Sequence, residues 1–499
     1  MELKILVKNT SYLVSTKIVT FLVGIIRSKL VAVFLGTVGA GIIGQLLNIV
    51  QQMSSFTLMG VNDGLVKQIA ENRDRKDFVN KLAYLLKSYI AIIASFATVC
   101  LIFLFLFSKE ITIYVFGDLK YFNYYIIGLI SFPVLIINSI SFALLKSHKE
   151  IKYIARSEVI VVVCNFIFFV PLIYLWGIKG AVIFVPLSLI TILIVNNYYA
   201  RVKVLKRYSL LTKDIFSASI NKKAIKELFV FAGVGLTAGV SLIVSEIACR
   251  SIVVTKLGID QIGIYSPLID WAGLFTGFIL PSVSTYLYPR FSEAKSNEEV
   301  SGVLNDVLRL VSFLMIPVLF LSIPIRYQII PLFYSKEFIS AGIYLPWHFI
   351  GILFNLWMYP LALVLTPTGR IKTYGVLVFI MSILNFAVVY YFVPLYGLYG
   401  WMLKFLISPI LFFVFYFYYL RKEINFRIEN RNKYIMIYTL VISLLIIAIE
   451  KYLKSDYKIN LLIGVFFTGI SFRFLSNSER NLLVSKLKTG KKNDKKDNL

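Results

Sequence analysis

Seven charged residues inside long apolar stretches of this sequence are candidates for a binding site, and their chemistry constrains what the chain can bind. The cations are Lys17, Arg27, Lys29, Arg250 and Lys404, and the acids are Glu246 and Asp270. A charge at the depth of a bilayer is costly, so it usually faces a water-filled cavity or an oppositely charged partner. Guanidinium and ammonium groups bind phosphate, and arginine does so through two parallel hydrogen bonds. The excess of cations therefore predicts a cavity that binds an anionic group.

The position of each charge along its apolar stretch suggests alternatives. Lys17 and Lys29 lie near the ends of their stretch, so their long side chains could extend to lipid headgroups. Arg27 and Arg250 lie deeper, which favours a cavity. Glu246 precedes Arg250 by one helical turn, and the two charges could partly neutralise each other. The two acids are either structural counter-ions or proton-coupled groups, and the sequence leaves both alternatives open.

A cationic cavity inside an apolar shell suits an anionic head group that carries a long lipid tail. A pyrophosphate-linked glycolipid would fit, with its sugar in the aqueous cavity and its tail in the bilayer. A soluble anion would fit the charges equally well, so the charges alone do not choose between these two ligands.

The composition indicates an all-α polytopic membrane protein. Of the 499 residues, 58% are hydrophobic and 16% are charged, whereas a soluble chain has about 25% charged residues. Apolar runs of about 20 residues recur throughout, which is the length needed to cross the hydrocarbon core. About fourteen transmembrane helices are predicted, at residues 13–34, 41–60, 79–107, 122–145, 157–176, 180–199, 228–254, 263–286, 307–325, 342–365, 374–393, 398–420, 434–450 and 459–475.

The basic residues gather in alternate loops between these spans. The formal net charge is +26, and the connection at 200–227 alone holds eight Lys and Arg residues, whereas loops 35–40 and 394–397 hold none. Such an asymmetry is typical of membrane topology, because basic loops stay in the cytoplasm. Both termini are therefore expected to be cytoplasmic, and no nucleic-acid partner is predicted.

The second half of the chain repeats the first at an offset of about 220 residues. Residues 151–180 align with residues 371–400, which places Gly177 and Gly180 on Gly397 and Gly400. Two further glycines, Gly36 and Gly41, align with Gly258 and Gly263. Each half has six spans, an even number, so both halves begin on the same side of the membrane. The repeats are therefore predicted to be parallel, related by an axis along the membrane normal, with a central cavity between two six-helix lobes.

The predicted organisation follows from this repeat. It comprises an N-terminal six-helix lobe at 1–200, a basic cytoplasmic linker at 201–227, a C-terminal six-helix lobe at 228–420, two additional transmembrane helices at 421–475 and a basic cytoplasmic tail at 476–499.

Several signatures of other function classes are missing from the sequence. It contains no G-x-x-x-x-G-K-[ST] loop of an ATP-driven pump, and no G-x-S-x-G or H-E-x-x-H motif. Cys100, Cys164 and Cys249 lie far apart inside predicted spans, which favours apolar core positions over a disulfide or metal set. We therefore expect neither an enzyme, nor a metal site, nor a bound cofactor.

Stretches in both halves carry a family resemblance. In the first half they are KIVTFLVGIIRSKLVAVFLG, GAGIIG and GVNDGLVKQIAE, and in the second they are CRSIVVTKLG, IGIYSPLIDWAG and YLYPRFSEA. By order and spacing they resemble the Wzx-type polysaccharide flippases. These form part of the polysaccharide transport branch of the multidrug/oligosaccharidyl-lipid/polysaccharide exporter (MOP) superfamily. The similarity covers nearly the whole chain, and SKLVAVFLG looks most like the O-antigen and enterobacterial common antigen subgroup.

The resemblance implies a function and a place in the cell. It implies alternating access that moves undecaprenyl-pyrophosphate-linked repeat units of O-antigen, capsule or a related polysaccharide across the bacterial inner membrane. The substrate would then pass to a polysaccharide polymerase, a ligase or a chain-length regulator. Coupling to a proton or sodium gradient is proposed for relatives, and no matching residue decides it here.

The resemblance also implies residues of the cavity. In such proteins, cations of the first and seventh spans line it, which by position points to Lys17, Lys29 and Arg250, with Asp270 in the eighth span. Arg27 and Lys404 are predicted from their depth in the membrane alone.

Three alternative functions remain open. A flippase for lipid II, the peptidoglycan precursor, differs only in its cargo. A drug/cation antiporter of the same superfamily would prefer acidic residues in the cavity, whereas here cations predominate. A membrane-embedded glycan polymerase or ligase would need a large outer domain, and the loop lengths predict none.

Overall fold

The structure is a computed structural model that describes residues 2–58, 60–73, 77–453 and 456–474. Within helices, the side chains of residues 2–15, 17–18, 63, 229–238 and 278 also lie outside the described part. The predicted tail at 476–499 lies outside it entirely.

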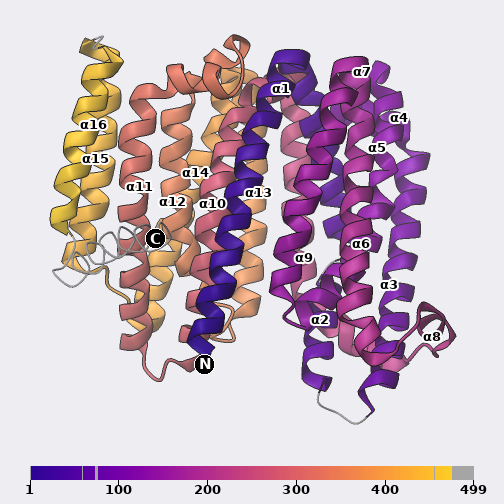
Figure 1. Ribbon diagram of the computed structural model, residues 1–499. Coiled ribbons are helices and arrows are strands. Elements are labelled where there is room, and N and C mark those ends of the chain that lie inside the picture. Colours follow the sequence, from indigo (N-terminus) through magenta and orange to yellow (C-terminus); the bar gives the residue numbers. More distant parts are fainter. Residues whose placement is uncertain (1, 59, 74–76, 454–455, 475–499) are drawn as a thin grey trace, which may run out of the picture. The chain divides into compact units, whose positions relative to one another are not determined.

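The described residues form helices and no strand (Figure 1). The α-helices are α1 (Glu2–Leu58), α2 (Val61–Asn72), α3 (Phe78–Leu106), α4 (Ser108–Phe116), α5 (Phe122–Leu129), α6 (Ser131–Ser147), α7 (Ile151–Lys203), α8 (Thr212–Ser217), α9 (Lys222–Leu257), α10 (Ile259–Glu293), α11 (Asn297–Phe333), α12 (Leu345–Leu363), α13 (Ile371–Tyr396), α14 (Leu398–Ile424), α15 (Asn430–Leu453) and α16 (Tyr457–Ser471). Short 3₁₀ helices are η1 (Leu119–Tyr121), η2 (Leu205–Tyr208), η3 (Lys336–Ile343) and η4 (Phe472–Phe474).

Many of these helices can cross a membrane. Within the described residues, nine helices are long and apolar enough, or ten if the bent pair Lys336–Ile343 and Leu345–Leu363 forms one span. Two of the nine, Val19–Leu58 and Ile151–Tyr208, each contain two predicted spans. Helices α9 and α16, which are not among the nine, each contain one more predicted span. Apart from residues 59 and 475, which lie outside the described part, the predicted spans consist mainly of helical residues. The predicted all-α polytopic fold class is confirmed, and the chain is a multi-pass membrane protein.

Glycines in the left-handed region divide the longest helices where the sequence predicts a turn. Gly36 breaks α1 with φ 63°, and its counterpart Gly258 separates α9 from α10 with φ 104°. Gly177 breaks α7 with φ 53°, and its counterpart Gly397 separates α13 from α14 with φ 58°. A residue with a Cβ rarely adopts this conformation. The predicted glycine repeat thus corresponds to two tight turns, each occurring once in each half.

The second glycine of the repeat creates a reciprocal contact between α1 and α10. A Cβ on Gly41 would lie 2.1 Å from the carbonyl oxygen of Ile259, and a Cβ on Gly263 would lie 1.8 Å from that of Thr37. Thr37 and Ile259 are themselves repeat partners, at the same offset as the two glycines. The glycine of each half therefore faces the carbonyl of the equivalent residue in the other half, as expected of two halves related by a twofold axis.

Tertiary contacts divide the chain into two units. Unit 1 comprises Met1–Asp270, Ile330–Ala341 and Ile371–Lys404, and unit 2 comprises Trp271–Ile329, Gly342–Arg370 and Phe405–Leu499. The units follow contacts and not the predicted sequence halves, so the division into two six-helix lobes stays a prediction.

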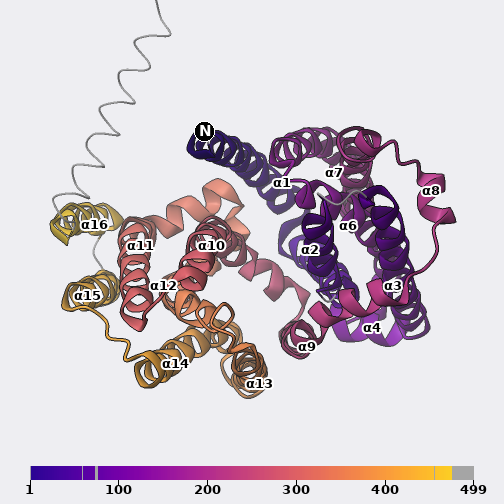
Figure 2. The ribbon, with the colours of Figure 1, turned by 90° about the horizontal axis from the view of Figure 1, so that it is seen from below.

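Unit 1 is built on a core that joins the first half of the chain to α9 and α13. A large apolar cluster runs from α2 and α3 through α6 to the start of α9, and includes Leu65, Leu85, Phe132 and Leu228. Helix α13 packs along α9, as Figure 2 shows from below.

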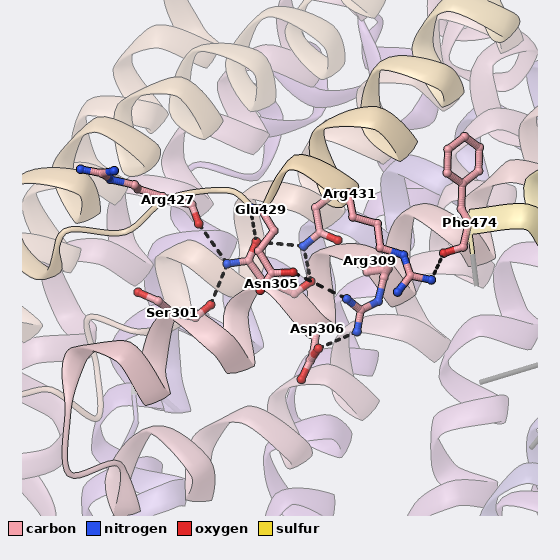
Figure 3. A network of polar contacts seen from close by, with 9 residues as sticks. Ser301, Asn305, Asp306, Arg309, Arg427, Glu429, Arg431 and Phe474 are labelled. Atoms are coloured by element: carbon pink, nitrogen blue, oxygen red, sulfur yellow. Dashed lines mark hydrogen bonds and ion pairs between the residues drawn. The ribbon is translucent and has the colours of Figure 1, made fainter. Parts of the chain in front are cut away.

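Unit 2 contains the two helices that the sequence predicts as an addition, and both ends of α15 are bound to α11. At one end, Asn305 of α11 contacts the turn before α15. Its side chain accepts from the Glu429 amide at 2.9 Å and from Asn432 Nδ2 at 2.8 Å (Figure 3). At the other end, Arg326 of α11 donates to both carboxylate oxygens of Glu450, at 2.6 and 2.7 Å. Helix α16 lies beside α15 (Figure 1), so the hairpin is an integral part of unit 2.

The reciprocal glycine contact leads to a prediction about stability. Gly41→Ala and Gly263→Ala should each destabilise the protein by about 1–3 kcal/mol, because the new methyl group overlaps a backbone carbonyl. Alanine would otherwise favour a helix by about 1 kcal/mol. Thermal unfolding of the detergent-solubilised protein measures the effect. Gly24→Ala is the control, because nothing lies within 4 Å of a Cβ there. Equal midpoints for the three variants would contradict the close crossing.

Candidate functional site

A cavity of about 140 Å³ lies within unit 1 against α1. Both parts of α1, on either side of the Gly36 break, contribute to its wall, together with α7, the start of α10 and the chain after α11. Most of the lining is apolar, and includes Val31, Phe169 and Phe184. The polar lining residues are Arg27, Ser28, Ser188, Ser266, Asp270 and Tyr334. The cavity is thus an apolar chamber with a small polar face.

The polar face centres on Asp270 of α10. One oxygen of its carboxylate, Oδ2, accepts from the Tyr334 hydroxyl at 2.8 Å and from Ser28 Oγ at 3.4 Å. Ser28 belongs to α1 and Tyr334 to the chain after α11, so this carboxylate connects three segments far apart in the sequence.

Arg27 lines the cavity beside this carboxylate and is exposed. Asp270 attracts it electrostatically. Yet among the described residues its guanidinium makes no hydrogen bond and no ion pair within 4 Å. Its donors are therefore available to an anion in the cavity, which bidentate recognition of a phosphate would use.

Residues 330–341 cover the end of the cavity near the break in α1. The Lys29 ammonium donates to the Pro331 carbonyl at 2.7 Å. A Cβ on Gly36 would lie 2.7 Å from Glu337 Oε2, so this side chain packs directly on the turn. Tyr334 and Phe338 of the same segment point their side chains to the cavity lining. This covering segment consequently contacts α1 at two points and α10 at one.

A second charged cluster in unit 1 lies apart from the lining of this cavity. Glu246 of α9 accepts from Arg250 Nε at 2.7 Å and from Lys404 Nζ at 2.5 Å. Arg250 also donates to the Gln45 side chain at 3.4 Å, and Gln45 donates in turn to the Val115 carbonyl at 2.7 Å. The Arg250 and Lys404 side chains retain only 11% and 8% of their exposure. Two cations thus share one carboxylate in a nearly buried site.

No group of three or more His, Cys, Asp or Glu residues suited to a metal ion occurs in the part of the chain that the structure describes.

Comparison with known proteins gives the family of the chain. The sequence model of the family described as "Polysaccharide biosynthesis protein" matches residues 6–295, more than half of the chain. The chain belongs to this family.

Named relatives and solved structures agree with that assignment. The chain is 20% identical to the lipid III flippase of Escherichia coli (strain K12), and also to that of Shigella flexneri, over 82% of this chain and 96% of theirs. Its fold is similar to that of a lipid II flippase, MurJ, in an inward closed conformation. The TM-score is 0.70 at 19% identity over 96% of this chain and 100% of that one. An inward-facing multidrug resistance MATE transporter of the MOP superfamily also gives a TM-score of 0.70, at 13% identity over 81% and 94%.

These findings support the coarser part of the predicted resemblance. The polysaccharide biosynthesis family and the fold of the MOP superfamily are shown, whereas membership of the Wzx-type subgroup stays a prediction. The named relatives are flippases and transporters and not enzymes, in agreement with the prediction.

The structure places the seven predicted site residues in different surroundings. Arg27 and Asp270 come together in the cavity. Glu246, Arg250 and Lys404 form the second cluster. Lys29 binds the covering segment, and the Lys17 side chain lies outside the described part of the chain.

Sequence reasoning missed the uncharged members of both sites. Ser28, Gln45 and Tyr334 have no intramembrane charge to mark them, and their partners are 242, 205 and 64 residues away in the sequence. The position of Ser28 next to Arg27 was the one available signal.

The shared carboxylate leads to a second prediction. Glu246→Gln should destabilise the protein, because Arg250 and Lys404 would lose their common counter-charge in a nearly buried site. Breaking a buried pair costs about 3–5 kcal/mol. Since Glu246 keeps 26% of its side-chain exposure, the lower end is expected. The measurement is thermal unfolding in detergent.

Two further variants make this test specific. Adding Lys404→Met should recover part of the loss, because a cation is removed together with its partner. Glu71→Gln is the matched control: its pair with Lys67 is about half exposed and should contribute almost nothing. If Glu246→Gln were as stable as Glu71→Gln, the cluster would have no structural role.

Proposed function

We propose that this protein is a flippase for lipid-linked oligosaccharides. It would move undecaprenyl-pyrophosphate-linked repeat units of a surface polysaccharide across the bacterial inner membrane by alternating access. The observation that carries the proposal is Arg27, an exposed cation without an ion pair within 4 Å among the described residues, in a cavity with mainly apolar walls. The family match and the flippase names of the relatives support the same cargo class.

Arg27 is the group suited to the charged part of such a cargo. A guanidinium binds phosphate oxygens bidentately, and the effect is stronger in an apolar cavity than in water. Asp270 would partly balance the positive charge of Arg27, and its hydrogen bond with Tyr334 would keep that side chain oriented toward the site. The sugars would occupy the aqueous cavity and the polyprenyl tail the bilayer.

The described cavity must widen to accept this cargo. Its volume of about 140 Å³ is well below the roughly 300–1,000 Å³ of pockets for drug-sized ligands. An oligosaccharide is larger still, so this conformation would hold at most the pyrophosphate. Opening requires that α1 separates from the covering segment. The direct contacts that would break are Lys29 to Pro331 and the packing of Glu337 on Gly36, and Asp270 would release either Ser28 or Tyr334.

Orientation, coupling and partners complete the proposal. The basic loops favour cytoplasmic termini. Substrate would then enter from the cytoplasmic leaflet and leave to a polymerase, ligase or chain-length regulator on the other side. Coupling to a proton or sodium gradient would act through Glu246 or Asp270, the two acids of the predicted site, each of which faces a cation.

The flipping of lipid II is the second candidate, and a specific observation favours it. The fold of the lipid II flippase MurJ covers 96% of this chain. A lipid II carrier would bind the same pyrophosphate, so Arg27 does not separate the two cargoes. A drug/cation antiporter fits the site less well, because an exposed cation repels a cationic drug.

Substitution of Arg27 tests the proposed site. In a strain whose surface polysaccharide depends on this protein, Arg27→Ala should lower that polysaccharide by at least about tenfold, the effect of losing 1.4 kcal/mol of binding. Lys256→Ala is the matched control, an exposed cation of α9 that is not among the cavity residues. Protein levels are compared by immunoblot. Equal polysaccharide in both variants would exclude Arg27 from the site.

Deletion of the gene separates the two cargoes. A surface polysaccharide flippase should be dispensable for growth, with lipid-linked repeat units accumulating on the inner leaflet. A lipid II flippase should be essential, and its depletion should cause lysis with accumulated peptidoglycan precursor. Lysis on depletion, with no change in surface polysaccharide, would reject the first cargo in favour of the second.

A further inference from the structure

The connection between α7 and α9 carries apolar side chains that no part of unit 1 covers. Leu211, Phe216 and Ile220 are 66%, 56% and 52% exposed. They belong to a segment of 18 residues, 204–221, which holds η2 and α8 and which, beyond Tyr208, lies outside the candidate membrane spans. A solvated loop would not be expected to expose three large apolar side chains so close together.

The segment is fixed in place and does not hang free. Leu205, Leu210 and Ile215 are buried in the apolar core of unit 1. At its start, Tyr208 packs against Phe78 at 5.0 Å between ring centroids. The buried and the exposed apolar residues thus occupy opposite sides of one ordered segment.

His148 completes this packing from the end of α6. Its ring lies 5.6 Å from that of Tyr208 and is 3% exposed. Burial lowers the pKa of His148 below its ordinary value, and the nearby Arg73 and Arg207 act in the same direction. A neutral His148 therefore holds the segment against α6 at physiological pH.

Contacts with α3 fix the position of the segment along the axis of that helix. Lys87 donates to the Phe216 carbonyl at 3.0 Å and lies 5.1 Å from the centre of the Phe216 ring. The Asn221 amide donates to Ser88 Oγ at 3.1 Å. Lys87 lies nine residues into α3, about 13 Å along its axis from Phe78. The segment therefore lies alongside α3, on the outside of unit 1 (Figures 1 and 2), and not below its end.

The segment meets α3 where the uncharged part of this helix begins. Beyond Lys87 and Ser88, α3 continues to Leu106 without a charged residue, which is the apolar length of a span. Lys87 is thus the last charge before the hydrocarbon core. The contacts of Phe216 and Asn221 with Lys87 and Ser88 place this part of the segment beside the point where the uncharged stretch of α3 begins.

The charge of the segment is complementary to one kind of surface. Exposed basic residues flank the apolar side chains, whereas Asp214 is the one acid between 204 and 221, and its carboxylate accepts from the Leu211 amide at 2.8 Å. The exposed basic residues are Lys206, Arg207, Lys213, Lys222, Lys223 and Lys226. Apolar side chains next to Lys and Arg are typical of segments that lie in an anionic lipid surface.

We propose that residues 204–221 form an interfacial anchor that binds the anionic lipids of the membrane leaflet at this side. Leu211, Phe216 and Ile220 insert among the acyl chains, and Lys213, Lys222 and Lys223 bind lipid phosphates. The anchor holds the connection between the two sequence halves in the membrane plane and is independent of the cargo.

A depth measurement tests the anchor in the full-length protein. Ile220→Cys and, independently, Leu211→Cys are labelled with a polarity-sensitive fluorophore after Cys100, Cys164 and Cys249 are replaced by Ala. The protein is reconstituted into nanodiscs of phosphatidylcholine with or without phosphatidylglycerol, each also made with brominated acyl chains. Brominated lipid should quench both labels, and more strongly when it is the anionic lipid.

Two comparisons decide the outcome. Glu71→Cys, an exposed position at the end of α2, should be quenched by aqueous iodide and not by brominated lipid. In the Ile220→Cys background, Lys213→Glu, Lys222→Glu and Lys223→Glu together should abolish the preference for brominated anionic lipid. Labels at 211 and 220 that iodide quenches as strongly as the label at 71 would overturn the proposal. Labels that neither quencher reaches would also overturn it, because a protein surface would then cover the segment.

Discussion

The close crossing of α1 and α10 is the constraint on which the rest of unit 1 depends. Gly41 faces the Ile259 carbonyl and Gly263 faces the Thr37 carbonyl, with no room for a side chain at either glycine. Backbones that approach this closely stabilise a helix pair in a membrane through dispersion, because lipid offers no hydrophobic driving force between helices. Since equivalent residues exchange roles, one interaction both joins the two sequence halves and sets their symmetry.

The charged sites follow from this crossing. Because α1 and α10 meet at the glycines, Ser28 and Asp270 lie within 3.4 Å although 242 residues separate them. Arg250 of α9 likewise contacts the other half of the sequence, at Gln45 of α1. Ser28 and Arg250 are repeat partners, so the two sites have diverged from equivalent positions. The site at Ser28 now presents the cation of Arg27 to a cavity, whereas at the site of Arg250 one acid, Glu246, neutralises two cations.

The fold was largely predictable from the sequence, and the sites only in part. Apolar length locates the spans, and glycines that recur after about 220 residues locate the turns at Gly36 and Gly177. The cost of a charge in the membrane is local information, so it identified Arg27 and Asp270.

The pairing of Lys404 with Glu246, 158 residues apart, depends on packing between α9 and the chain after α13, which no periodicity encodes. The contacts of the covering segment at 330–341 with α1 could likewise not be predicted, because they join residues about 300 positions apart in the sequence.

The proposed function requires that Arg27, in its apolar cavity, binds a pyrophosphate-linked glycolipid during its transfer across the membrane. The most direct measurement reconstitutes the purified protein in liposomes with a polyprenyl-pyrophosphate oligosaccharide and follows the appearance of sugar on the opposite leaflet with a membrane-impermeant glycosidase. We expect rapid transfer by the wild type, and transfer by Arg27→Ala reduced to the rate of protein-free liposomes. Equal transfer by both proteins would contradict it, as would a wild type that moves a cationic dye but not the glycolipid.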